Sequence, residues 1–138
     1  MGRELDKLTN EISLFKSEQN IWVIGKGISN SAGNLTLHIC GNLQHFIGNV
    51  LGNTNYIRNR DFEFSAKNIS RDKLIGEIIT TKEAVAATLT KLAENELQEE
   101  YPLEVLGYKM TKQYFLIHLF GHLNYHLGQI NYHRRLLD

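Results

Sequence analysis

The chain has 138 residues, which is enough for one domain with a hydrophobic core, and we expect residues 1–138 to form that single domain. Its 15 Lys and Arg residues balance 15 Asp and Glu residues, so the formal net charge of zero argues against a broad basic surface for nucleic acid. The single cysteine, Cys40, excludes an intramolecular disulfide and any zinc motif built from several cysteines, and its apolar surroundings predict a buried, inert thiol.

The amino-terminal stretch MGRELDKLTNEI is charged and lacks the apolar segment of a signal peptide. Elsewhere in the sequence, no apolar run is long enough to cross a bilayer. We therefore expect a cytoplasmic protein that acts without contact to a membrane or to nucleic acid.

Apolar residues at helical spacing predict two amphipathic helices in the first half of the chain. The first covers residues 3–22 and the second about residues 30–51, with Ser29 as the expected N-cap of the second. The pattern rests on Leu5, Leu8, Ile12, Phe15, Leu35, Ile39, Leu43, Phe46 and Val50. Residues 52–68 follow as a connection rich in turn-forming residues, and a loop of this length is often functional or held by its own packing.

Two more helices are predicted in the second half of the chain. Ser70 is the expected N-cap of a helix over residues 71–98, and Thr111 that of a helix which runs to the C-terminus. The segment between them contains Pro102, the only proline of the chain. With no convincing strand and no internal repeat, the sequence predicts an all-α four-helix bundle with a long connection between its second and third helices.

The last predicted helix carries four of the six histidines, in the stretch HLFGHLNYHLGQINYHRRLLD. On a helical wheel of about 100° per residue, His118, His122, His126 and His133 fall within an arc of about 80°. This arc adjoins the hydrophobic face, which is formed by Leu119, Leu123, Leu127 and Ile130. The histidines therefore point towards the core or its edge, where an imidazole needs a hydrogen-bond partner or a metal ion.

His122 and His126 are one helical turn apart and can bind one ion together, although the Glu of the zincin motif is absent. The second predicted helix carries His38, Asn42 and His45 on a similar stripe, and facing helices of a bundle build metal sites in this way. His38 and His45 are about 10 Å apart along a helix, so only one of them can join the pair. The alternative interpretation is a set of buried structural histidines without a metal.

Two segments resemble the DinB-like superfamily of four-helix-bundle proteins, and in particular an uncharacterised bacterial branch of it. They are NLTLHICGNLQHFIG in the second predicted helix and HLFGHLNYHLGQINYHRRLL in the last. The resemblance implies a divalent zinc, nickel or iron ion held by His38, His122 and His126. It also implies a homodimer and the use of a low-molecular-weight thiol, as in bacillithiol S-transferases and mycothiol-dependent isomerases. Relatives often have an arginine where this chain has Leu127, so we expect no role for that arginine here.

Four further residues are candidates for contacting the ligand histidines or for lining the pocket, namely His118, Gln129, Asn42 and Tyr125. Gln129 could equally pack against a neighbouring helix. In the segment RNRDFEF, Arg58 or Arg60 could bind an anionic ligand, while a salt-bridged loop is the preferred interpretation.

The expected function is that of a metal-dependent thiol S-transferase acting on a small-molecule substrate. Three histidines leave one position on a metal ion open, which is typical of reactive sites. An ion that activates water would instead give a hydrolase. The same histidines would also suit a non-catalytic metal-binding or stress-response protein, or a structural bundle with histidines in a cavity.

Overall fold

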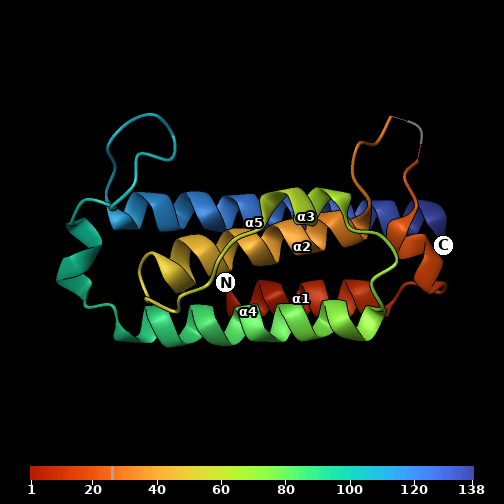
Figure 1. Ribbon diagram of the computed structural model, residues 1–138, viewed down its shortest axis with the longest axis horizontal. Helices are drawn as coiled ribbons and strands as arrows, with labels where there is room; N and C mark the ends of the chain where they lie inside the picture. The colour runs from red at the N-terminus through yellow and green to blue at the C-terminus, as the bar shows by residue number, and fades with distance from the viewer. Residues whose placement is uncertain (26) are drawn as a thin grey trace.

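The computed structural model describes residues 1–25 and 27–138, and within them it contains five α-helices and no strand (Figure 1). The helices are α1 (Gly2–Ser13), α2 (Ala32–Leu43), α3 (Arg60–Ser65), α4 (Arg71–Lys91) and α5 (Lys112–Leu137). Two 3-10 segments, η1 (Glu18–Trp22) and η3 (Glu94–Gln98), and a π-helical segment, η2 (Gln44–Asn49), complete the order of elements. The predicted all-α class is confirmed.

Two of the predicted helix starts are confirmed by their caps. The side-chain oxygens of Ser70 and Thr111 accept hydrogen bonds from backbone amides three residues further on, at 3.4 and 3.1 Å. The prediction of Ser29 as the third cap is wrong, because Ser31 caps α2 and accepts from the amide of Asn34 at 3.1 Å.

The first and third predicted helices are shorter than expected. Helix α1 ends at Ser13, and the chain then turns so that the amide of Lys16 donates to the carboxylate of Asp138 at 2.9 Å. Helix α4 ends at Lys91, where the amide of Ala93 donates to Glu96 at 2.8 Å and starts the next turn. The hydrogen bond after α1 joins residues far apart in the sequence, whereas the one after α4 is local and competes with continued helix. Apolar spacing alone reveals neither of them.

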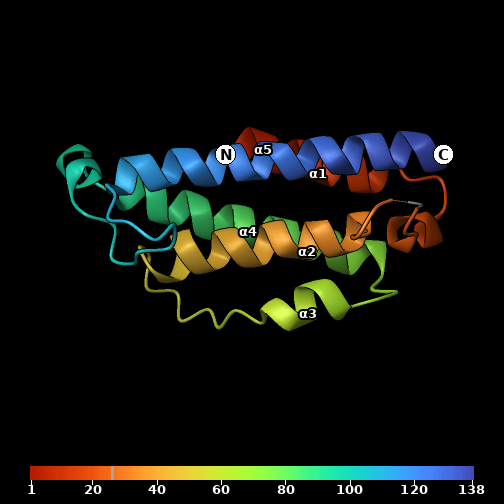
Figure 2. The ribbon, with the colours of Figure 1, turned by 90° about the horizontal axis from the view of Figure 1, so that it is seen from above.

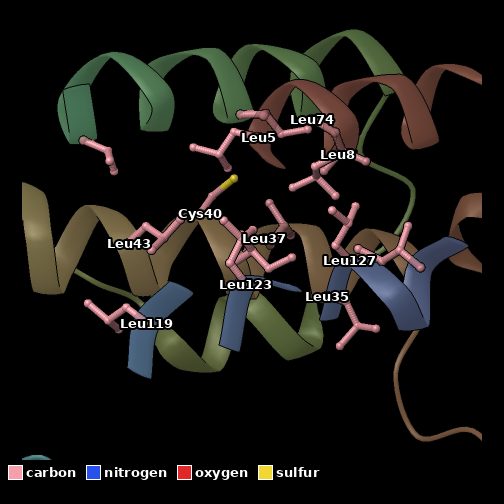
Figure 3. Packing of buried hydrophobic residues seen from close by; sticks show 14 of the residues in the cluster. Leu5, Leu8, Leu35, Leu37, Cys40, Leu43, Leu74, Leu119, Leu123 and Leu127 are labelled. Atoms are coloured by element: carbon pink, nitrogen blue, oxygen red, sulfur yellow. The ribbon is translucent and has the colours of Figure 1, made fainter. Parts of the chain in front are cut away.

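Four helices, α1, α4, α2 and α5, run side by side around the core, in that order (Figures 1 and 2). Their apolar positions at helical spacing meet there, as the leucines of α1, α2, α4 and α5 in Figure 3 illustrate. All 12 residues of α2 are buried, because α4, α5 and α3 cover it from different sides. Cys40 of α2 is buried as predicted, and burial raises the pKa of its thiol to about 12, so the thiol is inert.

The connection between residues 52 and 68 is not entirely a loop, because it contains α3 on the outer side of α2 (Figure 2). The buried amide of Asn34 donates to the backbone carbonyls of Glu63 and Ala66 at 3.0 and 2.9 Å. Asn59 caps α3 by accepting from the amide of Phe62 at 3.0 Å. This connection is thus held against the core by buried hydrogen bonds.

None of the described helices is both long enough and apolar enough to span a bilayer.

Candidate metal centre

Three histidines from two helices converge at the interface of α2 and α5. The Nε2 atoms of His38 and His126 each lie 3.1 Å from the Nε2 atom of His122. One nitrogen from each of the three residues lies within 4.8 Å of the others. Nitrogens about 2.0–2.1 Å from one tetrahedral zinc ion would be about 3.3 Å apart, so this spacing suits three ligands of a single ion.

Of the two histidines predicted on the second helix, only one lies next to the pair on α5. His38 lies in α2 and joins the pair from α5, whereas His45 lies in the π-helical segment η2 and is not part of the group. The Nδ1 atom of His45 is buried without a hydrogen-bond partner in the described part of the chain. His38 itself is only 5% exposed, so its ring is held deep in the interface.

The imidazoles of the pair are held in their neutral form. Burial, together with the nearby His126, His38 and His118, lowers the pKa of His122 to about 4. Burial also lowers the pKa of His126, although a hydrogen bond with Gln129 acts in the opposite direction. Neutral imidazole is the form that binds metal ions, so these two rings are ready to bind at neutral pH.

A carboxylate orients His38 from the side opposite the converging nitrogens. The Nδ1–H group of His38 donates to Oε2 of Glu63 at 2.9 Å, because an ionised carboxylate can only accept. This contact leaves the lone pair of Nε2 free to face His122 and His126. Glu63 reaches His38 from α3, so the 52–68 connection supplies one of the supports of the site.

Glu63 is itself fixed by an arginine. The Nε and Nη2 atoms of Arg58 donate to its two oxygens at 2.7 and 2.9 Å. Burial raises the pKa of Glu63, but the hydrogen bonds from Arg58 and His38 outweigh that effect and hold the pKa below its usual value. Glu63 therefore stays ionised, as an acceptor for His38 must.

A glycine makes room for this carboxylate. A Cβ atom added to Gly41 would lie 2.8 Å from Cδ of Glu63 and closer still to its Oε1 atom. Gly41 is three residues after His38 on α2, so it lies on the same side of the helix. The absence of a side chain at position 41 lets Glu63 approach α2 closely enough to reach His38.

The other predicted site residues take different positions around the three histidines. Gln129 accepts from the Nδ1–H group of His126 at 2.7 Å, which orients that ring as Glu63 orients His38. Asn42 and His118 line a cavity together with His38 and His122, and His118 is exposed and stacked on Phe115. The ring of Tyr125 lies 5.2 Å from that of His126 and is 64% exposed. The functions of these residues remain predictions.

Leu127 directly follows His126 on α5. Its side chain is 9% exposed and belongs to the core cluster, near Leu35 in Figure 3. This position therefore contributes packing and no charge to the centre.

Glu63 is not among the site residues that the sequence predicts. Glu63 is 25 residues from His38 in sequence and lies in a segment without helical periodicity, so no spacing rule connects the two. The only signal was the clustering of charges in RNRDFEF, which predicted a salt-bridged loop. That ion pair is present between Arg58 and Glu63, with the Arg58 side chain 11% exposed and the Glu63 side chain 4% exposed.

Two separate cavities adjoin the three histidines. One has a volume of about 430 Å³ and is bounded by His126, Gln129, His133 and residues 27–30, among others. The second, of about 180 Å³, is bounded by His38, His122, Asn42, Arg58 and Arg60, with several apolar side chains. Small molecules can thus approach the centre from two directions.

His133 lies beside the larger cavity, and its imidazole ring is buried. Both of its nitrogens lack a hydrogen-bond partner among residues 1–25 and 27–138. Replacing His133 with Phe removes these two polar atoms while keeping a flat ring, and we expect the free energy of unfolding at pH 7.5 to rise by about 1 kcal/mol. Urea denaturation of the metal-free protein measures this change.

The difference in the free energy of unfolding between the His133→Phe variant and the wild type is expected to be larger at pH 5.5 than at pH 7.5. Burial lowers the pKa of His133 in the folded protein, so the unfolded chain binds the proton first as the pH falls. The wild type therefore loses stability as the pH drops below the unfolded pKa of about 6.5, and the variant is spared this contribution. A variant that is less stable than the wild type at both pH values would show that the ring nitrogens are satisfied in solution.

Comparison with known proteins yields one family. The model of a family described as "Protein of unknown function (DUF1572)" matches residues 3–138. None of the curated proteins compared with the chain matches it.

Proposed function

The chain belongs to this family of unknown function, and we propose from its own site that it binds one divalent metal ion through His38, His122 and His126. The observation that carries the proposal is the convergence of three Nε2 atoms, with 3.1 Å between neighbours. The Nδ1 atoms of His38 and His126 are each engaged by an acceptor, as is usual for histidine ligands. A set of purely structural histidines would not need all three rings to point at one place.

We further propose that the fold is a DinB-like four-helix bundle, formed by α1, α2, α4 and α5, to which α3 is added. Placing α2 beside α5 in this arrangement supports the proposed ligand set. Three imidazole ligands without a thiolate suit zinc, nickel or iron(II). We expect residues 1–138 to work as a single domain in the cytoplasm.

The proposed activity is transfer of a low-molecular-weight thiol to a small-molecule electrophile. The thiol gives its proton to solvent, and its sulfur forms a C–S bond as the bond from that carbon to the leaving group breaks. A bound ion supplies Lewis acidity and favours the thiolate form of a thiol that coordinates it. The residues of the chain do the rest: Glu63 and Gln129 hold the rings of His38 and His126, and the ionised Glu63 makes His38 a better ligand. Two separate cavities beside the centre could each hold one of two reacting molecules. This supports a transferase rather than a hydrolase or a non-catalytic metal-binding or stress-response protein.

Metal analysis of the protein purified without a histidine tag tests the ligand set. We expect about one ion per wild-type chain and almost none in the His126→Ala variant, because one of three ligands is lost. The matched control is His118→Ala, which removes an exposed histidine two turns before His126 on the same helix and should leave the metal content unchanged.

Equal, substoichiometric metal in the wild type and in His126→Ala would overturn the metal site. Loss of metal from His118→Ala as well would overturn the three-histidine assignment. Incubating the metal-loaded wild type with small thiols and monochlorobimane then tests the chemistry, since transfer predicts a metal-dependent adduct with at least one thiol. No such adduct would favour a non-catalytic metal-binding protein.

We propose a homodimer with α5 at the contact. Apolar side chains of α5 that are exposed in the single chain support this: Ile117 is 65% exposed, Tyr132 72% and Leu136 76%. Exposed apolar surface of this kind often marks a protein interface. Light scattering, which gives the mass in solution, should return twice the mass of the 15.8 kDa chain.

A further inference from the structure

The smaller cavity beside the histidines has an unusual balance of charge. Its volume is about 180 Å³, and His38 and His122 form one side of it. Arg58 and Arg60 also line it, and no carboxylate is among its lining residues in the described chain. Apolar side chains, including Phe46, complete the wall. Such a cavity favours a molecule that combines negative charge with a small apolar body.

The two arginines of the cavity differ in how much of their charge is available. Arg58 is paired with the buried Glu63, so the two charges cancel. Arg60 is exposed and has no carboxylate within 4.0 Å in the part of the chain that the structure describes. Its guanidinium lies 5.6 Å from the centre of the Phe64 ring, and that ring lies 4.9 Å from the ring of His38. Phe64 thus holds the unpaired charge of Arg60 near the centre.

A buried amide in the same cavity also lacks a partner. Asn42 is 8% exposed, and its Oδ1 atom has no hydrogen-bond donor among the described residues. A buried acceptor left without a donor is unfavourable, so a ligand that supplies an O–H or N–H group gains by donating to it. Asn42 lies one helical turn after His38 on α2, and therefore on the side of the centre.

The size of the cavity limits the ligand. Each water molecule takes about 30 Å³ of liquid, so 180 Å³ corresponds to about six waters. Typical ligand pockets measure about 300–1,000 Å³. The part of a ligand held here is therefore only a few heavy atoms long.

We propose that this cavity binds a small organic carboxylate that also carries a hydroxyl or amine group. Arg60 holds the carboxylate through charge-assisted hydrogen bonds, and Asn42 accepts a hydrogen bond from the hydroxyl or amine. The ligand then lies against His38 and His122. The proposal rests on the proposed function in that it names the substrate class of the same site, while the contacts of Arg60 and Asn42 need no metal.

Titration with three related probes, followed by NMR spectroscopy of metal-free and zinc-loaded protein, tests the proposal. The probes are lactate, which has a carboxylate and a hydroxyl, propionate, which lacks the hydroxyl, and lactamide, which lacks the charge. We expect lactate to bind most tightly, propionate less tightly and lactamide not measurably. In Asn42→Ala the difference between lactate and propionate should disappear.

The Arg60→Gln variant should weaken lactate binding about tenfold to a hundredfold, since a hydrogen bond to a charged group contributes about 1.5–3 kcal/mol. The matched control is Arg135→Gln, which removes an exposed arginine that lines none of the cavities described above. It should bind lactate like the wild type, and the metal content of Arg60→Gln should equal that of the wild type.

Equal lactate affinity in the wild type and Arg60→Gln would overturn the proposal. So would equal binding of lactamide and lactate, equal weakening by Arg135→Gln, or no binding of lactate or propionate to either form of the wild type. If the wild type fails the metal analysis but binds lactate through Arg60, the metal site is overturned and the carboxylate site is supported. If it binds one metal ion but no lactate, the reverse holds, so the two proposals fail separately.

Discussion

Replacing Glu63 with Ala is expected to weaken zinc binding about 10–100-fold and to destabilise the metal-free protein by about 3–5 kcal/mol. The first effect follows because Glu63 accepts the Nδ1 proton of His38 and so fixes the ring that presents Nε2. The second follows because the Arg58 side chain, only 11% exposed, is left with a buried and unpaired charge. Competition with a chromogenic chelator measures zinc affinity, and urea denaturation measures stability.

A double variant separates these two effects of Glu63. Replacing a buried ion pair with apolar residues of similar size is often neutral or stabilising, so Arg58→Met combined with Glu63→Leu should recover most of the lost stability. It should not recover zinc affinity, because His38 still lacks its acceptor. Asp6→Asn serves as a control, since the exposed pair of Asp6 and Lys82 contributes at most about 1 kcal/mol. Zinc affinity in Glu63→Ala equal to that of the wild type would contradict the orienting role.

Replacing Gly41 with Ala is expected to destabilise the protein by about 1–3 kcal/mol and to weaken zinc binding. The added Cβ atom would lie 2.8 Å from Cδ of Glu63, whose carboxylate is held by Arg58 and His38 and has little freedom to move. In an open helix the same change would stabilise by about 0.5–1 kcal/mol. The sign of the change in stability, measured by thermal or urea unfolding, is therefore the test.

Gly76 supplies the matched control for this substitution. It lies in α4, is exposed, and a Cβ atom added to it would meet nothing within 4 Å. Gly76→Ala should therefore stabilise the protein by about 0.5–1 kcal/mol and leave zinc affinity unchanged. A Gly41→Ala variant as stable as Gly76→Ala would show that Glu63 does not need the space above Gly41.

The parts of the fold that the sequence predicted are those set by local physics. Ser70 and Thr111 were identifiable because a cap side chain and the helix that it starts are adjacent in sequence. The early end of α1 could not be identified from the sequence. It depends on the hydrogen bond between Lys16 and Asp138, which are 122 residues apart. Helix α3 was hidden for a related reason. Its six residues bury mainly the polar Glu63, so it has no apolar stripe.

In the candidate site too, the residues related by local spacing could be predicted, and those brought together by the fold could not. Spacing within one helix was enough to single out His122 and His126, which are four residues apart. Spacing could not choose between His38 and His45, since both fall on one stripe of a regular helix. The structure distinguishes them by where α2 faces α5 and by the change to π-helix after Leu43. Predicting Glu63 as a partner of His38 requires knowing how the 52–68 connection folds back against α2, and no local sequence pattern shows this.

The distance along the chain between His38 and His122 has a mechanical consequence. They are 84 residues apart, so an ion bound to both would act as a reversible cross-link between the early and the late part of the polypeptide. An unfolded chain must close that long loop before it can offer the same ligands, so the ion binds the folded state selectively. Such binding adds about 2.7 kcal/mol to stability when free metal is at 100 times its dissociation constant. The ion would then stabilise the packing of α5 against α2, in addition to any chemistry that it supports.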